Sequence, residues 1–178
     1  MQTQTTTAPL QAPPATATST GPRTYPVPTS VAPTALVVFC ADPRFHDATE
    51  RFVDEELGLH RHAYLPLEIP GGVASLTLTE LPKEAKYVRE AITFYLDHFQ
   101  SINKVVLINH EDCRKYKALQ EQLPRMTAFV RNLAERQHLD LVKVAELVLG
   151  LVSRHVTVER YYARFANAER TQITFDKK

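Results

Sequence analysis

Two short apolar runs constrain the fold of this chain more than any other feature of its sequence. Residues 35–40 have the sequence ALVVFC, and residues 104–109 have the sequence KVVLIN. Neither run alternates apolar with polar side chains, so each is typical of a strand that is buried on both faces. Such strands belong to parallel sheets with helices on both sides, which places the chain in the α/β class.

The segments around these two runs predict the remaining elements. We expect a helix capped by Asp47 that passes through Phe52 and Val53 and ends near Gly58, followed by a strand over residues 63–69. Three later apolar stripes with helical spacing predict three more helices. Their members are Val88, Ile92, Leu96 and Phe99; then Met126, Phe129, Val130 and Leu133; and then Leu141, Val144, Val148 and Leu151.

The end of the chain predicts a terminal hairpin. Residues 155–165 alternate as a strand, and a turn through residues 166–169 leads to a second strand at 172–175. Strand, helix, strand, helix, strand in this order predicts a mainly parallel β-sheet flanked by helices, with an antiparallel edge hairpin at the C-terminus.

The first 34 residues differ in composition from the rest. They hold seven of the twelve prolines and ten threonines, with Arg23 as their single charged side chain. We therefore expect a disordered Pro/Thr/Ala-rich tail over residues 1–34 and a folded domain over residues 35–178. The tail lacks the pattern of a secretory signal and of a basic amphipathic targeting helix. We expect a cytoplasmic protein, with import into an organelle as the alternative.

Charge and cysteine count exclude several classes of function. The chain carries 21 Lys+Arg against 20 Asp+Glu and has no long basic cluster, which argues against binding of nucleic acid or of anionic membranes by charge. No apolar run approaches the length of about 18 residues that a membrane span needs. Two cysteines are too few for a disulfide framework.

Both cysteines follow predicted buried strands. Cys40 ends the first strand, and Cys113 lies just beyond the strand at 104–109, with His110 three residues before it. The carboxyl ends of such strands are where ligands bind in open α/β sheets. One imidazole and two thiolates can hold a zinc ion and leave its fourth position for water. The alternative to a zinc site is a hydrogen-bonded loop histidine beside a cysteine that binds no metal.

The residues after Cys40 favour a chemical site. Asp42 and Arg44 follow it with single-residue gaps, so all three side chains can converge. Arg44 could hold Asp42 bidentately and keep it ionised as a hydrogen-bond acceptor for a metal-bound hydroxide. His46 is either a proton relay at the mouth of this site or an exposed loop residue.

The motifs C-x-D-x-R and H-x-x-C, each at the end of a buried strand, resemble those of the β-class carbonic anhydrases. The resemblance implies one zinc ion per chain, held by Cys40, His110 and Cys113, with Asp42 and Arg44 as the catalytic dyad. It implies reversible hydration of carbon dioxide to bicarbonate and a proton, by zinc-bound hydroxide that the dyad orients. It also implies a homodimer or higher homo-oligomer, and the zinc site favours a reducing compartment.

Two departures from the family pattern keep other functions open. Residues 114–116 are Arg-Lys-Tyr where members usually have glycine after the second cysteine, and residues 68–73 have the sequence EIPGGV where members usually have one like RNAGN. The first alternative is hydrolysis of carbon disulfide or carbonyl sulfide at the same site. The second is a non-catalytic zinc-binding protein.

Overall fold

The computed structural model describes residues 24–28 and 30–178. Most of the predicted tail therefore lies outside the described residues, and its described part, 24–28 and 30–34, forms neither helix nor strand. Among residues 24–28 and 30–178, no helix is both long enough and apolar enough to cross a bilayer.

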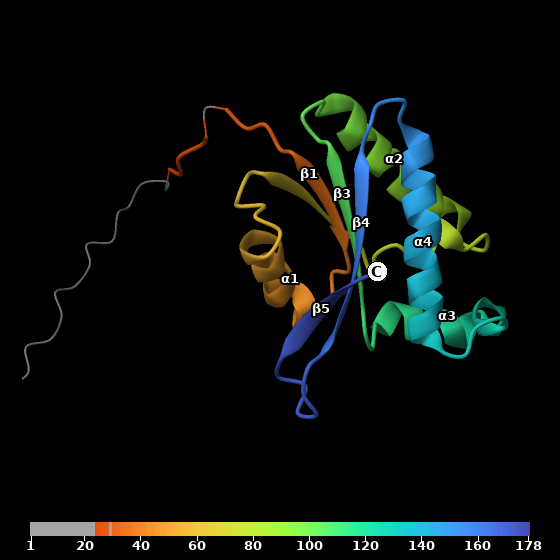
Figure 1. The fold of residues 1–178 in the computed structure, drawn as a ribbon. Helices are drawn as coiled ribbons and strands as arrows, with labels where there is room; N and C mark the ends of the chain where they lie inside the picture. The colour runs from red at the N-terminus through yellow and green to blue at the C-terminus, as the bar shows by residue number, and fades with distance from the viewer. Residues whose placement is uncertain (1–23, 29) are drawn as a thin grey trace, which may run out of the picture.

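The domain is built on one five-stranded sheet, as the two apolar runs predict (Figure 1). The strands lie in the order β2-β1-β3-β4-β5; the first four are parallel, and β5 pairs with β4 in the antiparallel sense. The mainly parallel sheet with a C-terminal edge hairpin is thus confirmed. The strands are β1 (Ala35–Phe39), β2 (Tyr64–Glu68), β3 (Lys104–His110), β4 (Thr157–Phe165) and β5 (Ile173–Lys177).

Helices cover both faces of the sheet, with α1 on one face and α2 and α4 on the other (Figure 1). Because both faces are covered, every residue of β1 is buried. The helices are α1 (Pro43–Glu55), α2 (Pro82–His98), α3 (Arg114–Gln122) and α4 (Leu133–Leu151), with 3-10 turns η1 (Ala74–Thr77) and η2 (Pro124–Thr127). The stripes predicted for α2 and α4 pack together against one face of the sheet.

Two of the helix predictions were wrong in detail. The first helix is capped by Asp42, not Asp47, because the Asp42 side chain accepts a hydrogen bond from the backbone N–H of Arg44 and Pro43 begins the helix. The stripe from Met126 to Leu133 is not helical. It runs from Met126 in η2 through a loop, where Phe129 is fully exposed, to Leu133, the first residue of α4.

The chain reverses its winding direction between β1 and β3. From β1 it passes through α1 to β2 on one side, and from β2 it crosses through α2 to β3 on the other side of β1. Since crossovers between parallel strands are right-handed, this reversal puts α1 and α2 on opposite faces. The carboxyl ends of β1 and β3 therefore form the switch point at which α/β proteins bind ligands.

Candidate metal centre

The switch point brings the three predicted ligands together. Cys40 follows β1 directly, His110 is the last residue of β3, and Cys113 is the N-cap residue of α3. Their ligand atoms all lie within 4.8 Å of one another, and all three residues are buried. Across residues 24–28 and 30–178, this is the one group of three His, Cys, Asp or Glu side chains close enough to hold a metal ion.

The donor set fits a zinc ion. The Sγ atoms of Cys40 and Cys113 are 3.8 Å apart and form no disulfide. Two Zn–S bonds of about 2.3 Å at a tetrahedral angle require a sulfur separation of about 3.8 Å. His110 Nε2 is buried without a hydrogen-bond partner among the described residues, as a nitrogen reserved for a metal would be.

The second nitrogen of His110 is held by the backbone. Nδ1 lies 2.8 Å from the carbonyl oxygen of Glu111, and because a carbonyl only accepts, Nδ1 carries the proton in this contact. Nε2 then presents a lone pair toward the two thiols. This backbone contact fixes the tautomer and the ring orientation that a metal ligand needs.

The contact between the two thiols shifts their pKa values in opposite directions. A hydrogen bond from Cys113 lowers the pKa of Cys40 to about 4 against the opposing effect of burial, with smaller contributions from His110 and from the backbone N–H of Gly71, 3.2 Å from Sγ. The hydrogen bond to Cys40 and burial raise the pKa of Cys113. A cation between the sulfurs would stabilise both thiolates and displace the remaining proton.

The backbone conformation and surroundings at position 71 favour glycine. Its φ of +87° lies in the left-handed region, and a Cβ atom there would be 2.8 Å from Cγ of Lys115. The glycine pair after β2 thus supplies a backbone donor to a thiolate, in a segment where the sequence departs from the family pattern.

Asp42 and Arg44 form the bidentate pair expected from the sequence. Arg44 Nε donates to Asp42 Oδ1 at 3.0 Å, and its NH2 group donates to Oδ2 at 2.7 Å. These hydrogen bonds hold the pKa of Asp42 below its usual range even though the residue is buried. Asp42 is therefore an ionised acceptor with a fixed orientation, two residues after the predicted ligand Cys40.

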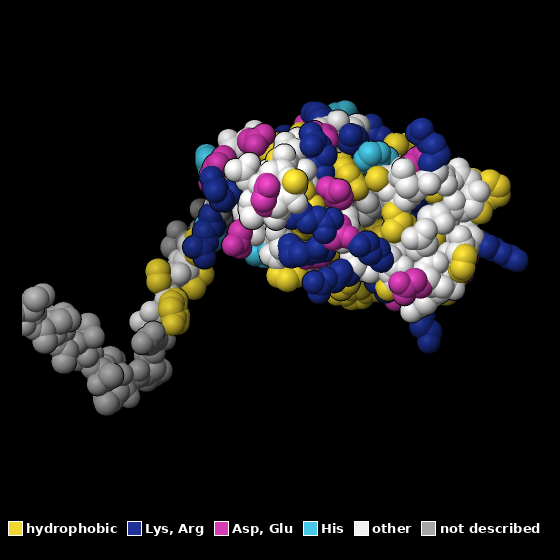
Figure 2. Space-filling view, turned by 90° about the horizontal axis from the view of Figure 1, so that it is seen from below, with side chains coloured by type: hydrophobic (Ala, Val, Ile, Leu, Met, Phe, Trp, Pro, Cys, Tyr) yellow, Lys and Arg dark blue, Asp and Glu magenta, His cyan; other side chains and the backbone are white. Residues whose placement is uncertain are grey.

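A second carboxylate, which the sequence analysis did not single out, lies on the other side of Arg44. Arg44 NH1 donates to Asp112 Oδ2 at 2.9 Å, while Lys117 and Arg170 also contact the Asp112 carboxylate. Hydrogen bonds from Lys117 and then Arg44 lower the pKa of Asp112 to about 2. We call these four residues, together with Asp42, the outer ion cluster. Figure 2 shows Lys and Arg gathered with acidic side chains on this end of the molecule.

A buried polar layer lies behind the ligands. Gln137 of α4 donates from Nε2 to the carbonyl oxygen of His110 at 2.9 Å, and its Oε1 accepts from the hydroxyl of Tyr162 at 2.9 Å. Asn109 Nδ2 donates to the Gln137 carbonyl and to the hydroxyl of Tyr116. Helix α4 thereby fixes the end of β3, on which His110 lies.

A buried ion pair completes this layer. Asp140 is fully buried and accepts from the Tyr116 hydroxyl at 2.9 Å and from Arg136 Nε at 2.9 Å. Arg136 also donates to the carbonyl oxygen of Met126 and to Thr77. The inner polar layer is defined by Asn109, Tyr116, Arg136, Gln137, Asp140 and Tyr162.

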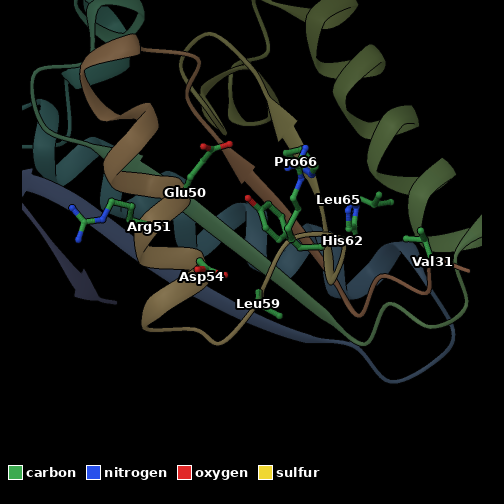
Figure 3. Close-up of a pocket in the computed structure, with 10 residues that line it drawn as sticks. Val31, Glu50, Arg51, Asp54, Leu59, His62, Leu65 and Pro66 are labelled. Carbon is green, nitrogen blue, oxygen red and sulfur yellow. The ribbon is translucent and has the colours of Figure 1, made fainter. Parts of the chain in front are cut away.

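A small open cavity of about 160 Å³ reaches Cys40 and Asp42. Its other lining residues are Ala41, Pro43, Pro70, Gly71, Arg114 and Lys115. A larger pocket, of about 750 Å³, lies between α1 and the β2 edge (Figure 3). It contains none of the predicted site residues, whereas the smaller cavity is lined by Cys40 and Asp42.

The other histidines are not brought to the ligands. His46 Nδ1 lies 3.2 Å from Glu68 Oε1 and its Nε2 lies 3.6 Å from Glu50 Oε1, at the start of α1. His60 is exposed and pairs with Asp54. A relay role for His46 stays a prediction.

Solved structures share this fold. The chain is similar to a carbonic anhydrase from Streptococcus mutans, with a TM-score of 0.51, 17% sequence identity, and coverage of 86% of this chain and 87% of that one. It is similar to the β-carbonic anhydrase CafA of Aspergillus fumigatus, with a TM-score of 0.50, 15% identity, and coverage of 83% and 76%. It is also similar to a β-carbonic anhydrase from Trichomonas vaginalis, with a TM-score of 0.50, 10% identity, and coverage of 86% of this chain and 87% of that one.

No protein-family model and no curated protein matches the sequence. At identities of 10–17%, the structural likeness shows a β-carbonic-anhydrase-like fold. The expected fold is therefore confirmed, and the function is argued from the residues of the site.

Proposed function

We propose that this protein is a zinc-dependent enzyme that reversibly hydrates carbon dioxide to bicarbonate and a proton. The observation that carries the proposal is the convergence of three ligand atoms within 4.8 Å beside a carboxylate that an arginine holds bidentately. Three protein ligands favour a catalytic over a structural zinc site, because structural sites use four.

Cys40, His110 and Cys113 would hold the zinc ion. When bound, zinc acts as a Lewis acid that lowers the pKa of water from about 15.7 toward 7, which makes a hydroxide nucleophile available at neutral pH. The lowered pKa of Cys40 suits a site that binds a divalent cation.

Asp42 would orient the reacting oxygen. Arg44 donates two side-chain hydrogen bonds to the Asp42 carboxylate and keeps it ionised, so Asp42 acts as a hydrogen-bond acceptor and not as a donor. Oδ1 already accepts from the backbone N–H and Nε of Arg44, so the remaining lone pair of Oδ2 can take a hydrogen bond from the nucleophile, which then keeps one of its own lone pairs aimed at the carbon of carbon dioxide.

The cavity suits a small substrate. Ala41, Pro43 and Pro70 give it apolar walls that admit an uncharged molecule, while Arg114 and Lys115 supply positive charge beside an anionic product. Lys115 also forms an ion pair with Glu84 at 3.5 Å, which partly neutralises its charge.

Stopped-flow measurement of carbon dioxide hydration, paired with metal analysis, tests the proposal. We expect one zinc per chain, hydration by the natural protein, and loss of most activity in Asp42→Ala with zinc retained. Asp176→Ala, which breaks the exposed pair of Asp176 with Arg164 on β4 and β5, is the matched control.

Two outcomes would reject the proposal. A protein without zinc contradicts the ligand assignment. A zinc-loaded protein that hydrolyses carbonyl sulfide but does not hydrate carbon dioxide contradicts the substrate. A homo-oligomeric state and a cytoplasmic location remain predictions, and light scattering after size exclusion measures the first.

A further inference from the structure

Arg44 is held from two sides. Its Nε and NH2 groups donate to Asp42, while NH1 donates to Asp112 Oδ2 at 2.9 Å and NH2 donates to the Asp112 carbonyl oxygen at 2.9 Å. Both the side chain and the backbone of Asp112 thus fix one guanidinium plane. The orientation of Asp42 depends on that plane, so the contact of Arg44 with Asp112 determines how firmly Arg44 holds Asp42.

Asp112 is itself firmly held. Lys117 of α3 and Arg170 of the β4–β5 turn contact its carboxylate, which is 13% exposed. Its φ of +59° turns the backbone between His110 and Cys113 so that its carbonyl faces Arg44. Three cations on one carboxylate, from three different elements, exceed what an isolated surface ion pair provides.

We propose that Asp112 is a positioning residue for the dyad: it fixes the Arg44 guanidinium so that Asp42 keeps a single orientation toward the metal site. The inference rests on the proposed function, but the order that Asp112 imposes on Arg44 can be measured without any turnover.

Asp112→Asn is the main test, because asparagine tolerates the left-handed backbone conformation. It removes the charge and turns one of the two oxygens into a donor that cannot face Arg44, Lys117 or Arg170 favourably. Asp112→Gly also tolerates the backbone conformation and removes the side chain altogether. Asp176→Asn, in the Arg164 pair, is the matched control.

The first readout is chemical. The zinc-loaded protein is treated with phenylglyoxal, and modification of Arg44 is followed by mass spectrometry. We expect the rate at Arg44 to rise about tenfold in Asp112→Gly and by less in Asp112→Asn, with no change in the control. The same rate in all four proteins would overturn the proposal, whether or not the natural protein hydrates carbon dioxide.

The second readout is kinetic. The orientation of Asp42 affects the reacting oxygen and not the binding of carbon dioxide. We therefore expect kcat to fall at least tenfold in Asp112→Gly while KM changes by less than about twofold. Zinc should stay at one per chain. Loss of zinc from both Asp112 variants would overturn the proposal in favour of a role in shaping the ligand loop.

Discussion

The molecule contains two arginine–carboxylate systems that differ mainly in depth. In the outer ion cluster, the Arg44 side chain is 30% exposed and contacts two carboxylates. In the inner polar layer, Arg136 pairs with an Asp140 side chain that has no exposure, and the tyrosine hydroxyls and amides around it are also buried. Asp42 of the outer cluster lines the small cavity, and the inner layer joins α3 and α4 to the end of β3.

This difference in burial predicts different roles for the two arginine–carboxylate systems. A buried charge that loses its partner keeps its desolvation penalty, so the inner pair contributes mainly to the stability of the fold. Arg44 is partly exposed and also pairs with Asp112, so it keeps solvent and a second carboxylate when the charge of Asp42 is removed, and we expect this change to cost little stability. The outer pairs mainly fix the orientation of Asp42 beside the thiols.

The largest expected effect on stability is in the inner layer. Asp140→Ala leaves the Arg136 side chain, which is 14% exposed, without its carboxylate and the Tyr116 hydroxyl without an acceptor. We expect the free energy of unfolding to fall by roughly 3–5 kcal/mol. Urea denaturation monitored by circular dichroism measures it. A loss below about 1 kcal/mol would remove the distinction between the two systems.

An intermediate effect is expected from Tyr162→Phe, which leaves Gln137 Oε1 without its hydroxyl donor. We expect a loss of about 1–2 kcal/mol at neutral pH. Burial raises the pKa of Tyr162, so the unfolded chain loses this proton first as the pH rises above about 10.

The sign of this pH effect follows from proton binding. Above about pH 10 the folded state holds more protons than the unfolded state, so the stability falls as pH rises, by up to about 1.4 kcal/mol per pH unit for one proton. The decline should be shallower in Tyr162→Phe. Equal slopes between pH 10 and 12 would show that Tyr162 is not buried as described.

The smallest effect on stability is expected in the outer cluster. Asp42→Asn keeps an N-cap side chain on α1, since asparagine caps helices as well as aspartate does. We expect the free energy of unfolding to change by less than about 1 kcal/mol, whereas hydration of carbon dioxide falls about a hundredfold or more. A large loss of stability would place Asp42 with the inner residues instead.

The sequence predicts the outer site better than the inner one for a physical reason. Cys40, Asp42 and Arg44 are neighbours in one loop, so their spacing alone places them together. Gln137 and Asp140 lie on α4, where a polar residue cannot be told from one on a solvated face until the helix is docked. Asp112 is one of two unspecified positions in H-x-x-C, and its role depends on Arg44, 68 residues away.

The helix errors have the same origin. The spacing from Met126 to Leu133 is helical, but Pro124 begins a short turn and Asn132 caps the next helix, so the spacing is accidental. Helix α3 went unpredicted because it buries only Tyr116 and Leu119. Short helices with few apolar residues are defined by what they pack against.

The reversal of winding at β1 has a consequence for the order of folding. Cys40 and His110 meet only when β1 and β3 pair, after the chain has passed through β2 and α2. No local segment can assemble the three ligands, so a growing chain has no complete site before Cys113 has been made. Metal uptake during refolding would therefore report completion of the central strand pair, not collapse of the chain.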